Sequence, residues 1–257
     1  MAEPEKTPPE EGFLSHLIEL RARLVRAAGG VLVAFVALSP FMKRIFDYVS
    51  QPMMKALPEG SKLLATGVIA PFMVPLKVTL FAAFLLASPW VLYQAWAFVA
   101  PGLYQHEKRL AGPVIVSSVL MFFGGMAYCY YVVFGVVFHF ISHFAPQSVN
   151  VSPDIEQYFD FVMRMFIAFG LAFEVPIAVM LLVRMGVTTV AKLRQVRPYM
   201  VVGAFVIAAI FTPPDVMSQM LLALPLWALF ELGVVLAAFF GTPKAQSSTS
   251  TELTTKS

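Results

Sequence analysis

Long uncharged stretches dominate the pattern of hydrophobic and polar positions along the chain. A membrane-spanning helix needs about 20 mostly apolar residues, and six segments reach or approach this length. They are Ala27–Met42, Val78–Gln105, Val114–Phe138, Arg164–Arg184, Pro198–Phe211 and Val216–Phe240. The pattern therefore predicts an all-α polytopic membrane protein with six transmembrane helices.

The fifth of these segments is the shortest. At a rise of about 1.5 Å per residue it falls well short of a ~30 Å hydrocarbon core, so we expect the bilayer to be thinner there. The turn Thr212-Pro213-Pro214-Asp215 separates it from the sixth segment. In that turn Thr212 is a candidate helix cap, and the carboxylate of Asp215 suits the positive end of the next helix dipole.

The distribution of Lys and Arg predicts how the chain is oriented. Most of the 18 Lys and Arg residues precede the first segment, follow the sixth, or lie between the second and third or the fourth and fifth. Because cytoplasmic loops carry the excess of positive charge, both termini are predicted to be cytoplasmic. On the other side, the longest loop is expected over about Asp47–Ala70, and Pro146–Gln157 is expected to form a second outer cap.

The two ends of the chain differ from its apolar middle. Residues 1–12 are acidic and Pro-rich and lack the basic region and cleavage site of a signal peptide, so none is predicted. Residues 241–257 are rich in Ser and Thr. We therefore predict a disordered tail over 1–12, a six-span membrane domain over 13–240, and a disordered cytoplasmic tail over 241–257.

Composition narrows the possible classes of function. The chain is 59% hydrophobic and 13% charged, whereas soluble domains average roughly 45–50% and about 25%. This argues against a soluble enzyme and against a disordered chain. The single cysteine, Cys129, excludes an internal disulfide. The net charge of +3 comes from scattered residues rather than a basic patch, so nucleic acid is not predicted as a partner.

Motifs for catalysis, metals and cofactors are weak. The sequence contains no phosphate-binding loop and no HExxH motif, and Ser117-Ser118 lacks the context of a nucleophile elbow. His139 and His143 share a helical spacing, but no acidic residue is close enough in sequence to complete a metal site. We predict no cofactor and no enzymatic activity, and an intramembrane hydrolase is the least favoured alternative.

Glu174 interrupts the fourth apolar segment near its centre. A charged side chain at the bilayer midplane costs roughly 2.5–3.5 kcal/mol on insertion scales, so such residues are candidates for function. Two interpretations stay open: a protonated carboxyl that staples two helices, or a polar site that faces a cavity or a partner helix. Pro176 is expected to kink the helix close by. A proton-coupled transporter of a small solute, with Glu174 as proton carrier, is the alternative function, although the sequence shows no repeated halves.

Two carboxylates stand out on the basic cytoplasmic side. Glu19 lies in a predicted amphipathic helix over residues 13–24, and Glu107 lies in the short loop 101–109. Glu19 and Arg23 have the spacing of a helix ion pair worth about 0.2–0.5 kcal/mol, which is one interpretation. The other interpretation is that both carboxylates bind arginine side chains of a partner. The forked guanidinium group of arginine matches the two oxygens of a carboxylate better than the ammonium group of lysine does.

Six short motifs follow one another within the membrane domain. They begin at Ser15, Pro71, Phe98, Ala168, Arg197 and Thr212, and they read SHLIELRARL, PFMVPLK, FVAPGLYQHEKR, AFGLAFEVP, RPY and TPPDVMSQ. In these motifs the chain resembles the TatC family, the multi-spanning subunit of the twin-arginine protein translocase.

The resemblance implies a function, partners and roles for particular residues. It implies a receptor for twin-arginine signal peptides that exports folded proteins across the bacterial inner membrane. The receptor would work with the single-span subunits TatA and TatB, use the proton-motive force, and form a cupped bundle that is homo-oligomeric within the complex. Signal-peptide binding is assigned to Glu19, Glu107, Arg21, Phe98 and Tyr104. Structural or transport roles are assigned to Pro52, Glu174 and Asp215, and contacts with partner helices to Thr212 and Gln219.

Overall fold

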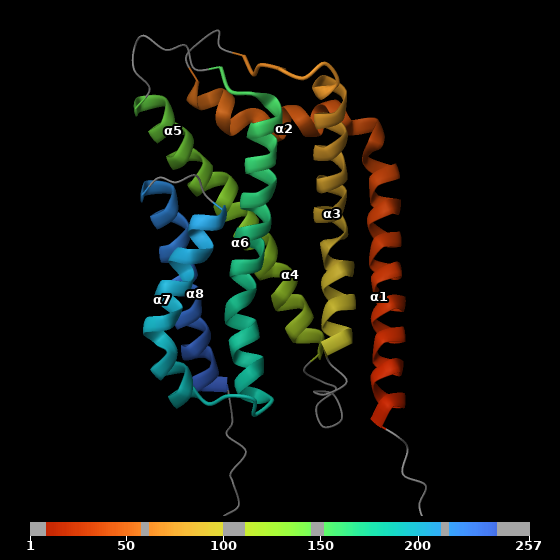
Figure 1. The fold of residues 1–257 in the computed structure, drawn as a ribbon, viewed down its shortest axis with the longest axis vertical. Coiled ribbons are helices and arrows are strands. Elements are labelled where there is room, and N and C mark those ends of the chain that lie inside the picture. Colours follow the sequence, from red (N-terminus) through yellow and green to blue (C-terminus); the bar gives the residue numbers. More distant parts are fainter. Residues whose placement is uncertain (1–8, 58–61, 100–110, 145–151, 212–215, 241–257) are drawn as a thin grey trace, which may run out of the picture.

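The computed structural model describes residues 9–57, 62–99, 111–144, 152–211 and 216–240, and the structural statements below concern these residues. They form a helical bundle (Figure 1). The helices are α1 (Pro9–Leu38), α2 (Met42–Ala56), α3 (Ala70–Val99), α4 (Ala111–Tyr128), α5 (Phe134–Phe144), α6 (Ile155–Arg184), α7 (Val190–Phe211) and α8 (Val216–Phe240). A 3-10 turn, η1 (Ser39–Phe41), follows α1, and a π-helical turn, η4 (Cys129–Val133), joins α4 to α5.

Six helical stretches of the described chain are long and apolar enough to cross a membrane, judged by length and composition. They are Leu17–Ala56, Ala70–Phe98, Gly112–Phe140, Ile155–Arg184, Val190–Phe211 and Gln219–Phe239. The predicted all-α bundle with six transmembrane helices is therefore confirmed. Figure 1 shows that α1 begins and α8 ends at the same end of the bundle. Helix α1 begins at Pro9, and the division into a tail and a membrane domain at residue 13 stays a prediction.

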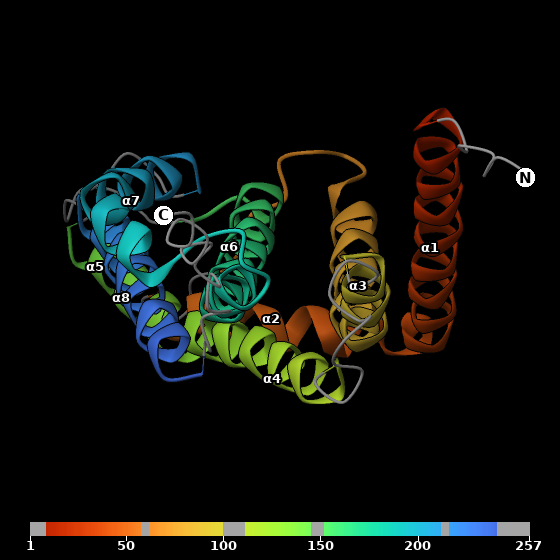
Figure 2. The same ribbon diagram turned by 90° about the horizontal axis from the view of Figure 1, so that it is seen from below.

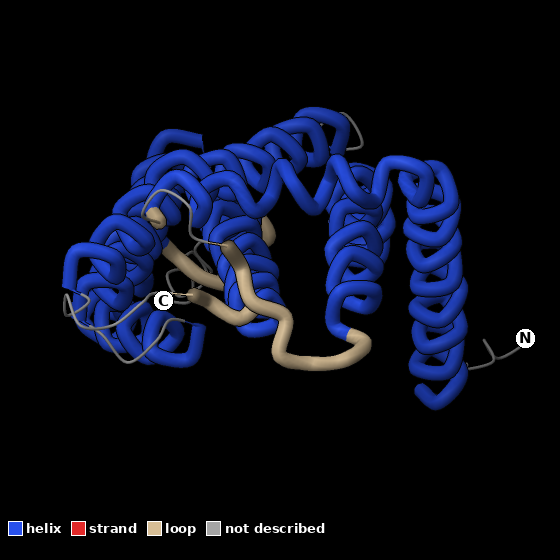
Figure 3. Tube along the Cα trace, turned by 90° about the horizontal axis from the view of Figure 1, so that it is seen from above, coloured by secondary structure: helices blue, strands red, loops and turns tan. Residues whose placement is uncertain are grey.

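The segment expected to be the longest outer loop is partly helical. The chain turns at η1, where Pro40 lacks the N–H that would continue α1. Helix α2 then runs across the end of the bundle opposite the start of α1 (Figures 1 and 3) and packs against α3 and α5. The expected loop over Asp47–Ala70 is thus wrong as far as Ala56. The reason is that α2 mixes apolar and charged positions, so hydropathy alone does not separate it from a polar loop.

Polar contacts tie the start of α6 to neighbouring segments. Asp154 caps α6 by accepting a hydrogen bond from the backbone N–H of Glu156 at 2.9 Å. The Thr66 hydroxyl donates to Asp154 Oδ2 at 2.6 Å, and Leu64 forms a parallel bridge with Asp154. Lys77 of α3 donates to the Glu156 carboxylate at 2.9 Å. These contacts hold the chain between α2 and α3 against the described part of the second outer cap.

Helix α7 is longer than the apolar segment that predicts it. It has 22 residues, which correspond to about 33 Å of helix, and its first turns carry Lys192 and Arg194. Lys and Arg are good helix formers, so their charge ends the apolar segment without ending the helix. Figure 1 shows that the α7–α8 pair nevertheless stops short of the level of α2. Local thinning of the bilayer at this pair stays a prediction.

Helix α6 is the centre of the bundle. It packs against α3, α4, α7 and α8, and Figure 2 shows it between the α1–α3 pair and the α7–α8 pair. Small residues allow the neighbouring helices to come close. A Cβ on Gly125 of α4 would collide with the Phe169 carbonyl oxygen, and one on Gly233 of α8 would stand 2.8 Å from Cα of Pro176. Pro176, the residue expected to kink α6, therefore lies at a close contact with α8.

Candidate functional site

Helices α1 and α3 pack side by side and run in opposite directions (Figures 1 and 2). Their register is set where the Trp90 Nε1–H donates to the carbonyl oxygen of Arg26 at 3.0 Å. The Trp90 ring fits there because residue 30 is glycine: a Cβ on Gly30 would stand 2.6 Å from Trp90 Cδ1. From this contact Glu19 and Phe98 each lie about 10–12 Å further toward the same end of the bundle. Two of the predicted site residues therefore share one level of the α1–α3 pair.

The Glu19 carboxylate forms the ion pair that its spacing allows. Arg23 donates to Glu19 Oε1 through Nε at 2.9 Å and through Nη2 at 2.6 Å. Because both donors bind Oε1, the described chain supplies no donor to Oε2. The Glu19 side chain is 36% exposed, and Arg21 is exposed on the same helix. A partly exposed carboxylate and an exposed guanidinium group thus lie two residues apart on α1.

Several predicted site residues lie outside the part of the chain that the structure describes. They are Tyr104, Glu107, Thr212 and Asp215. Their roles stay predictions. The side chain of His143 is likewise outside, so the weak His139–His143 pair is not placed. Within the described residues, no group of three or more His, Cys, Asp or Glu side chains could hold a metal ion.

Glu174 ends a hydrogen-bond chain that crosses three helices. The Trp96 Nε1–H of α3 donates to Ser118 Oγ of α4 at 2.8 Å. Ser118 Oγ in turn donates to Glu174 Oε2 of α6 at 2.5 Å. Ser118 is fully buried, and Glu174 is half-buried. Since the hydroxyl oxygen accepts the indole N–H, its single proton is directed to the carboxyl group.

This network bears on both interpretations of Glu174. The bond to Ser118 staples α6 to α4, as the structural interpretation requires. Glu174 Oε1, however, is buried and has no hydrogen-bond partner in the described chain. A buried polar atom without a partner costs about 1–3 kcal/mol. The carboxyl group therefore joins two helices through Oε2, while Oε1 has no partner in the described chain.

The sequence does not reveal the other members of this network. Trp96 and Ser118 lie 22 residues apart, and Ser118 and Glu174 lie 56 apart. The signal that could have found them is the polar pair Ser117-Ser118 in the middle of an apolar segment. Such a pair needs a polar partner when it is buried.

Two polar contacts join α7 to α8. Gln219 Nε2 donates to the carbonyl oxygen of Phe205 at 3.1 Å, so the amide nitrogen of this predicted contact residue already has a partner within the chain. Arg197 and Glu231 form an ion pair at 2.5 Å. Their separation of 34 residues hides this pair from sequence reasoning. Both contacts hold the two helices as a unit.

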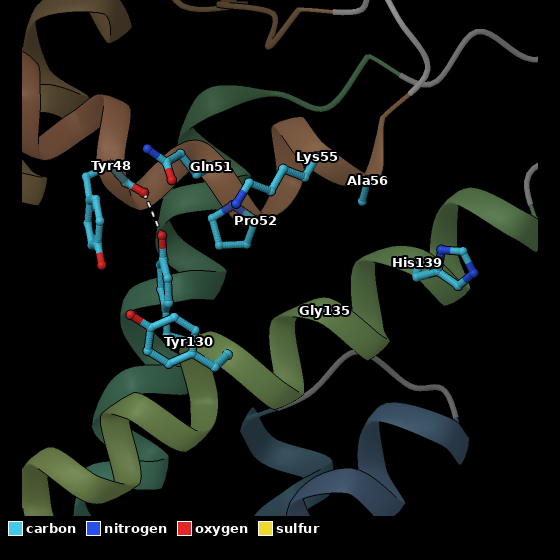
Figure 4. A pocket seen from close by; sticks show the side chains of 9 residues that line it. Tyr48, Gln51, Pro52, Lys55, Ala56, Tyr130, Gly135 and His139 are labelled. Carbon is cyan, nitrogen blue, oxygen red and sulfur yellow. Dashed lines mark hydrogen bonds between the residues drawn. The ribbon is translucent and has the colours of Figure 1, made fainter.

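Pro52 lies inside α2 and removes one backbone N–H. In a regular helix that N–H would donate to the carbonyl oxygen of Tyr48. The Tyr130 hydroxyl of η4 donates to this oxygen instead, at 3.0 Å (Figure 4). The carbonyl oxygen of Val49, which follows Tyr48 in α2, accepts a hydrogen bond from the Tyr158 hydroxyl of α6 at 2.9 Å. Tyrosines from two other helices therefore hold α2 at its proline, which is a physical basis for a structural role of Pro52.

These features define a multi-pass helical membrane protein with polar groups at the ends of its helices and a half-buried carboxyl group near its centre. The sequence profile of the family described as "Sec-independent protein translocase protein (TatC)" matches residues 15–225. The protein of that name from Azotobacter chroococcum mcd 1 is 52% identical over 229 residues, which are 89% of this chain and 88% of the relative. The one from Escherichia coli strain K12 is 49% identical over 236 residues, 92% of this chain and 90% of the relative.

A solved structure agrees with these relatives. The crystal structure described as "Twin Arginine Translocase Receptor- TatC" superposes with a TM-score of 0.77 at 35% identity, covering 87% of this chain and 98% of that one. The chain therefore belongs to the TatC family, and it is a component of the Tat protein translocase. The relatives are named as translocase proteins.

Proposed function

We propose that the chain is the signal-peptide receptor and core scaffold of the twin-arginine translocase. It exports folded proteins across the bacterial inner membrane, with TatA and TatB as partners and the proton-motive force as the energy source. The observation that carries the proposal is the Glu19 carboxylate, partly exposed at the level of Phe98 and with Oε2 open to a donor.

The Glu19–Arg23 pair does not prevent recognition of an arginine from outside. An exposed pair at this helix spacing contributes about 0.3–0.5 kcal/mol. A charge-assisted hydrogen bond to an incoming guanidinium contributes about 1.5–3 kcal/mol. The incoming arginine binds Oε2 while Arg23 stays on Oε1, and its bond is stronger than the Arg23 pair. Glu107 supplies the second carboxylate, so that two arginines are read together.

The orientation of the chain supports a cytoplasmic recognition site. The end of the bundle where α1 begins carries Arg21, Arg23 and Arg26 on α1, and Lys192 and Arg194 at the start of α7. By the positive-inside rule this end faces the cytoplasm, with both termini on that side. Signal peptides of proteins made in the cytoplasm then meet Glu19 before export.

Later steps use the other polar groups. Glu174 Oε1 is the docking point for a polar group of a partner helix, after the signal peptide has bound. Thr212 and Gln219 provide further contacts for the single-span partners, and Asp215 stabilises the turn before α8. Several copies of the chain assemble within the complex.

The test compares Glu19→Ala with Arg23→Ala in binding of a purified twin-arginine precursor. We expect Glu19→Ala to weaken binding about tenfold or more, because a charge-assisted bond is lost. Arg23→Ala should leave binding unchanged or strengthen it, since it frees Glu19 Oε1. Asp47→Ala, at the outer end of the bundle, is the control for a lost surface carboxylate. An equal, small loss of stability in the two variants, without a loss of binding, would show that Glu19 serves only as the helix partner of Arg23.

A further inference from the structure

A pocket at the outer end of the bundle takes no part in the function proposed above. It lies between α2 and the η4–α5 segment and has a volume of about 450 Å³ (Figure 4). Its walls are formed by Tyr48, Gln51, Pro52, Lys55, Ala56, Tyr130, Tyr131, Gly135 and His139. The pocket is therefore made by segments that are far apart in sequence.

The walls of the pocket are held in place by the bonds around Pro52. The Tyr130 hydroxyl donates to the Tyr48 carbonyl oxygen, and the two tyrosine rings stack with centroids 5.4 Å apart. The π-helical turn places the next residue, Tyr131, edge-on against Tyr130. Turns of this kind occur frequently at functional sites. The pocket is thus a built feature of the fold, with a fixed wall on the side of η4.

The lining is rich in hydrogen-bond donors and contains no carboxylate. Lys55 supplies an ammonium group from the exposed side of α2, and Figure 4 shows its side chain on the same helix as Pro52. Gln51 supplies an amide, and Tyr48 and Tyr131 supply hydroxyl groups. This set of groups suits an anion with several acceptor oxygens.

The pocket also lies near the end of a candidate membrane span, and phospholipid headgroups lie at the ends of such spans. The candidate span Gly112–Phe140 ends beside it, and α2 lies across the outer end of the bundle. Tyrosines gather at membrane–water interfaces, because the ring is apolar and the hydroxyl is polar. The pocket combines three of them with one lysine.

We propose that this pocket binds the phosphate group of a phospholipid headgroup from the outer leaflet. Lys55 pairs with the phosphate, the hydroxyl groups and Gln51 donate hydrogen bonds to its oxygens, and the acyl chains run down the apolar outer surface of the bundle. This site is separate from the recognition of signal peptides at the opposite end.

The test uses the full-length protein purified in detergent, with phosphatidylglycerol added and bound lipid counted by native mass spectrometry. Lys55→Gln removes the charge from an exposed side chain. Gly135→Leu fills the pocket, because a Cβ on Gly135 meets nothing within 4 Å, and leucine is the better helix former. The matched controls are Lys43→Gln on α2 and Gly29→Leu on α1, which also has nothing within 4 Å of a Cβ.

We expect Lys55→Gln to weaken retention of one lipid about tenfold, and Gly135→Leu to abolish it, while both controls retain it. Equal retention by the wild type and both pocket variants would overturn the proposal, and so would an equal loss in Lys43→Gln. If excess inorganic phosphate displaces the lipid, the pocket binds free phosphate and the assignment to lipid is wrong. If the pocket variants keep the lipid but lose transport, the pocket serves a protein partner instead.

Discussion

The Tyr130 hydroxyl donates to the Tyr48 carbonyl oxygen, which lacks its usual helix donor because residue 52 is proline. We therefore predict that Tyr130 and Pro52 are energetically coupled. With Pro52 present, Tyr130→Phe leaves the Tyr48 carbonyl oxygen with no donor other than water. A hydrogen bond of this type contributes about 0.5–1.5 kcal/mol, and because this one is exposed we expect about 0.5–1 kcal/mol. Pro52→Ala restores a backbone N–H that donates to the same oxygen. In the Ala background Tyr130→Phe should therefore cost close to nothing.

The four proteins of this cycle are compared by their free energy of unfolding in mixed micelles, measured by titration with a denaturing detergent. The expected coupling energy is about 0.5–1 kcal/mol, at the lower end of the range for residues that share a bond. Tyr131→Phe is the control, because its hydroxyl does not bind the Tyr48 carbonyl oxygen and its cost should not depend on residue 52. An equal cost of Tyr130→Phe in both backgrounds would refute the argument that the tyrosine replaces the missing N–H.

Two further predictions concern Glu174 and Asp154. Glu174→Gln should keep precursor binding and much of transport, because the amide keeps a donor and an acceptor, whereas Glu174→Ala should spare binding and impair transport. Loss of binding in the folded Gln variant, with binding and proton-driven transport measured separately, would place Glu174 in recognition. Hydrogen bonds from the Thr66 hydroxyl and then from the backbone N–H of Gln157 lower the pKa of Asp154 in the folded protein. The ionised Asp154 carboxylate therefore stabilises the fold fully above its unfolded pKa of about 3.9, and this stabilisation is lost as the pH falls through the lower folded-state pKa. Melting temperatures between neutral and acidic pH should fall less steeply for Thr66→Val than for the wild type, and equal slopes would contradict this.

The membrane character of the fold could be predicted from the sequence, because each spanning helix must be apolar along its own length. The limits of the helices could not. The apolar segments in the sequence stop at Lys77 in α3 and at Arg197 in α7, whereas the helices continue through these residues. Charged residues at the ends of membrane helices are stable where they pair or reach water, and Lys77 does so with Glu156.

The polar contacts between helices were beyond sequence reasoning for a different reason. Glu174 stands out as a carboxylate in an apolar segment, but nothing near it in sequence indicates its bond to Ser118. In the same way Pro52 is visible as a proline, whereas the tyrosines that bind the neighbouring carbonyl groups come from η4 and α6. A single residue in an unusual environment can be found from its neighbours in sequence, but its partners are set by how the helices pack.

We propose that carboxylates at the cytoplasmic end of the bundle bind the paired arginines of a signal peptide. The most direct measurement is binding of a purified twin-arginine precursor to membranes that contain Glu107→Lys, with Glu107→Gln and a twin-lysine precursor as controls. We expect Glu107→Lys to insert normally and not to bind the precursor, and Glu107→Gln to bind it more weakly than the wild type. We also expect the wild type to discriminate against the twin-lysine precursor. Normal binding of the twin-arginine precursor by Glu107→Lys would show that the Glu107 carboxylate does not bind the signal arginines.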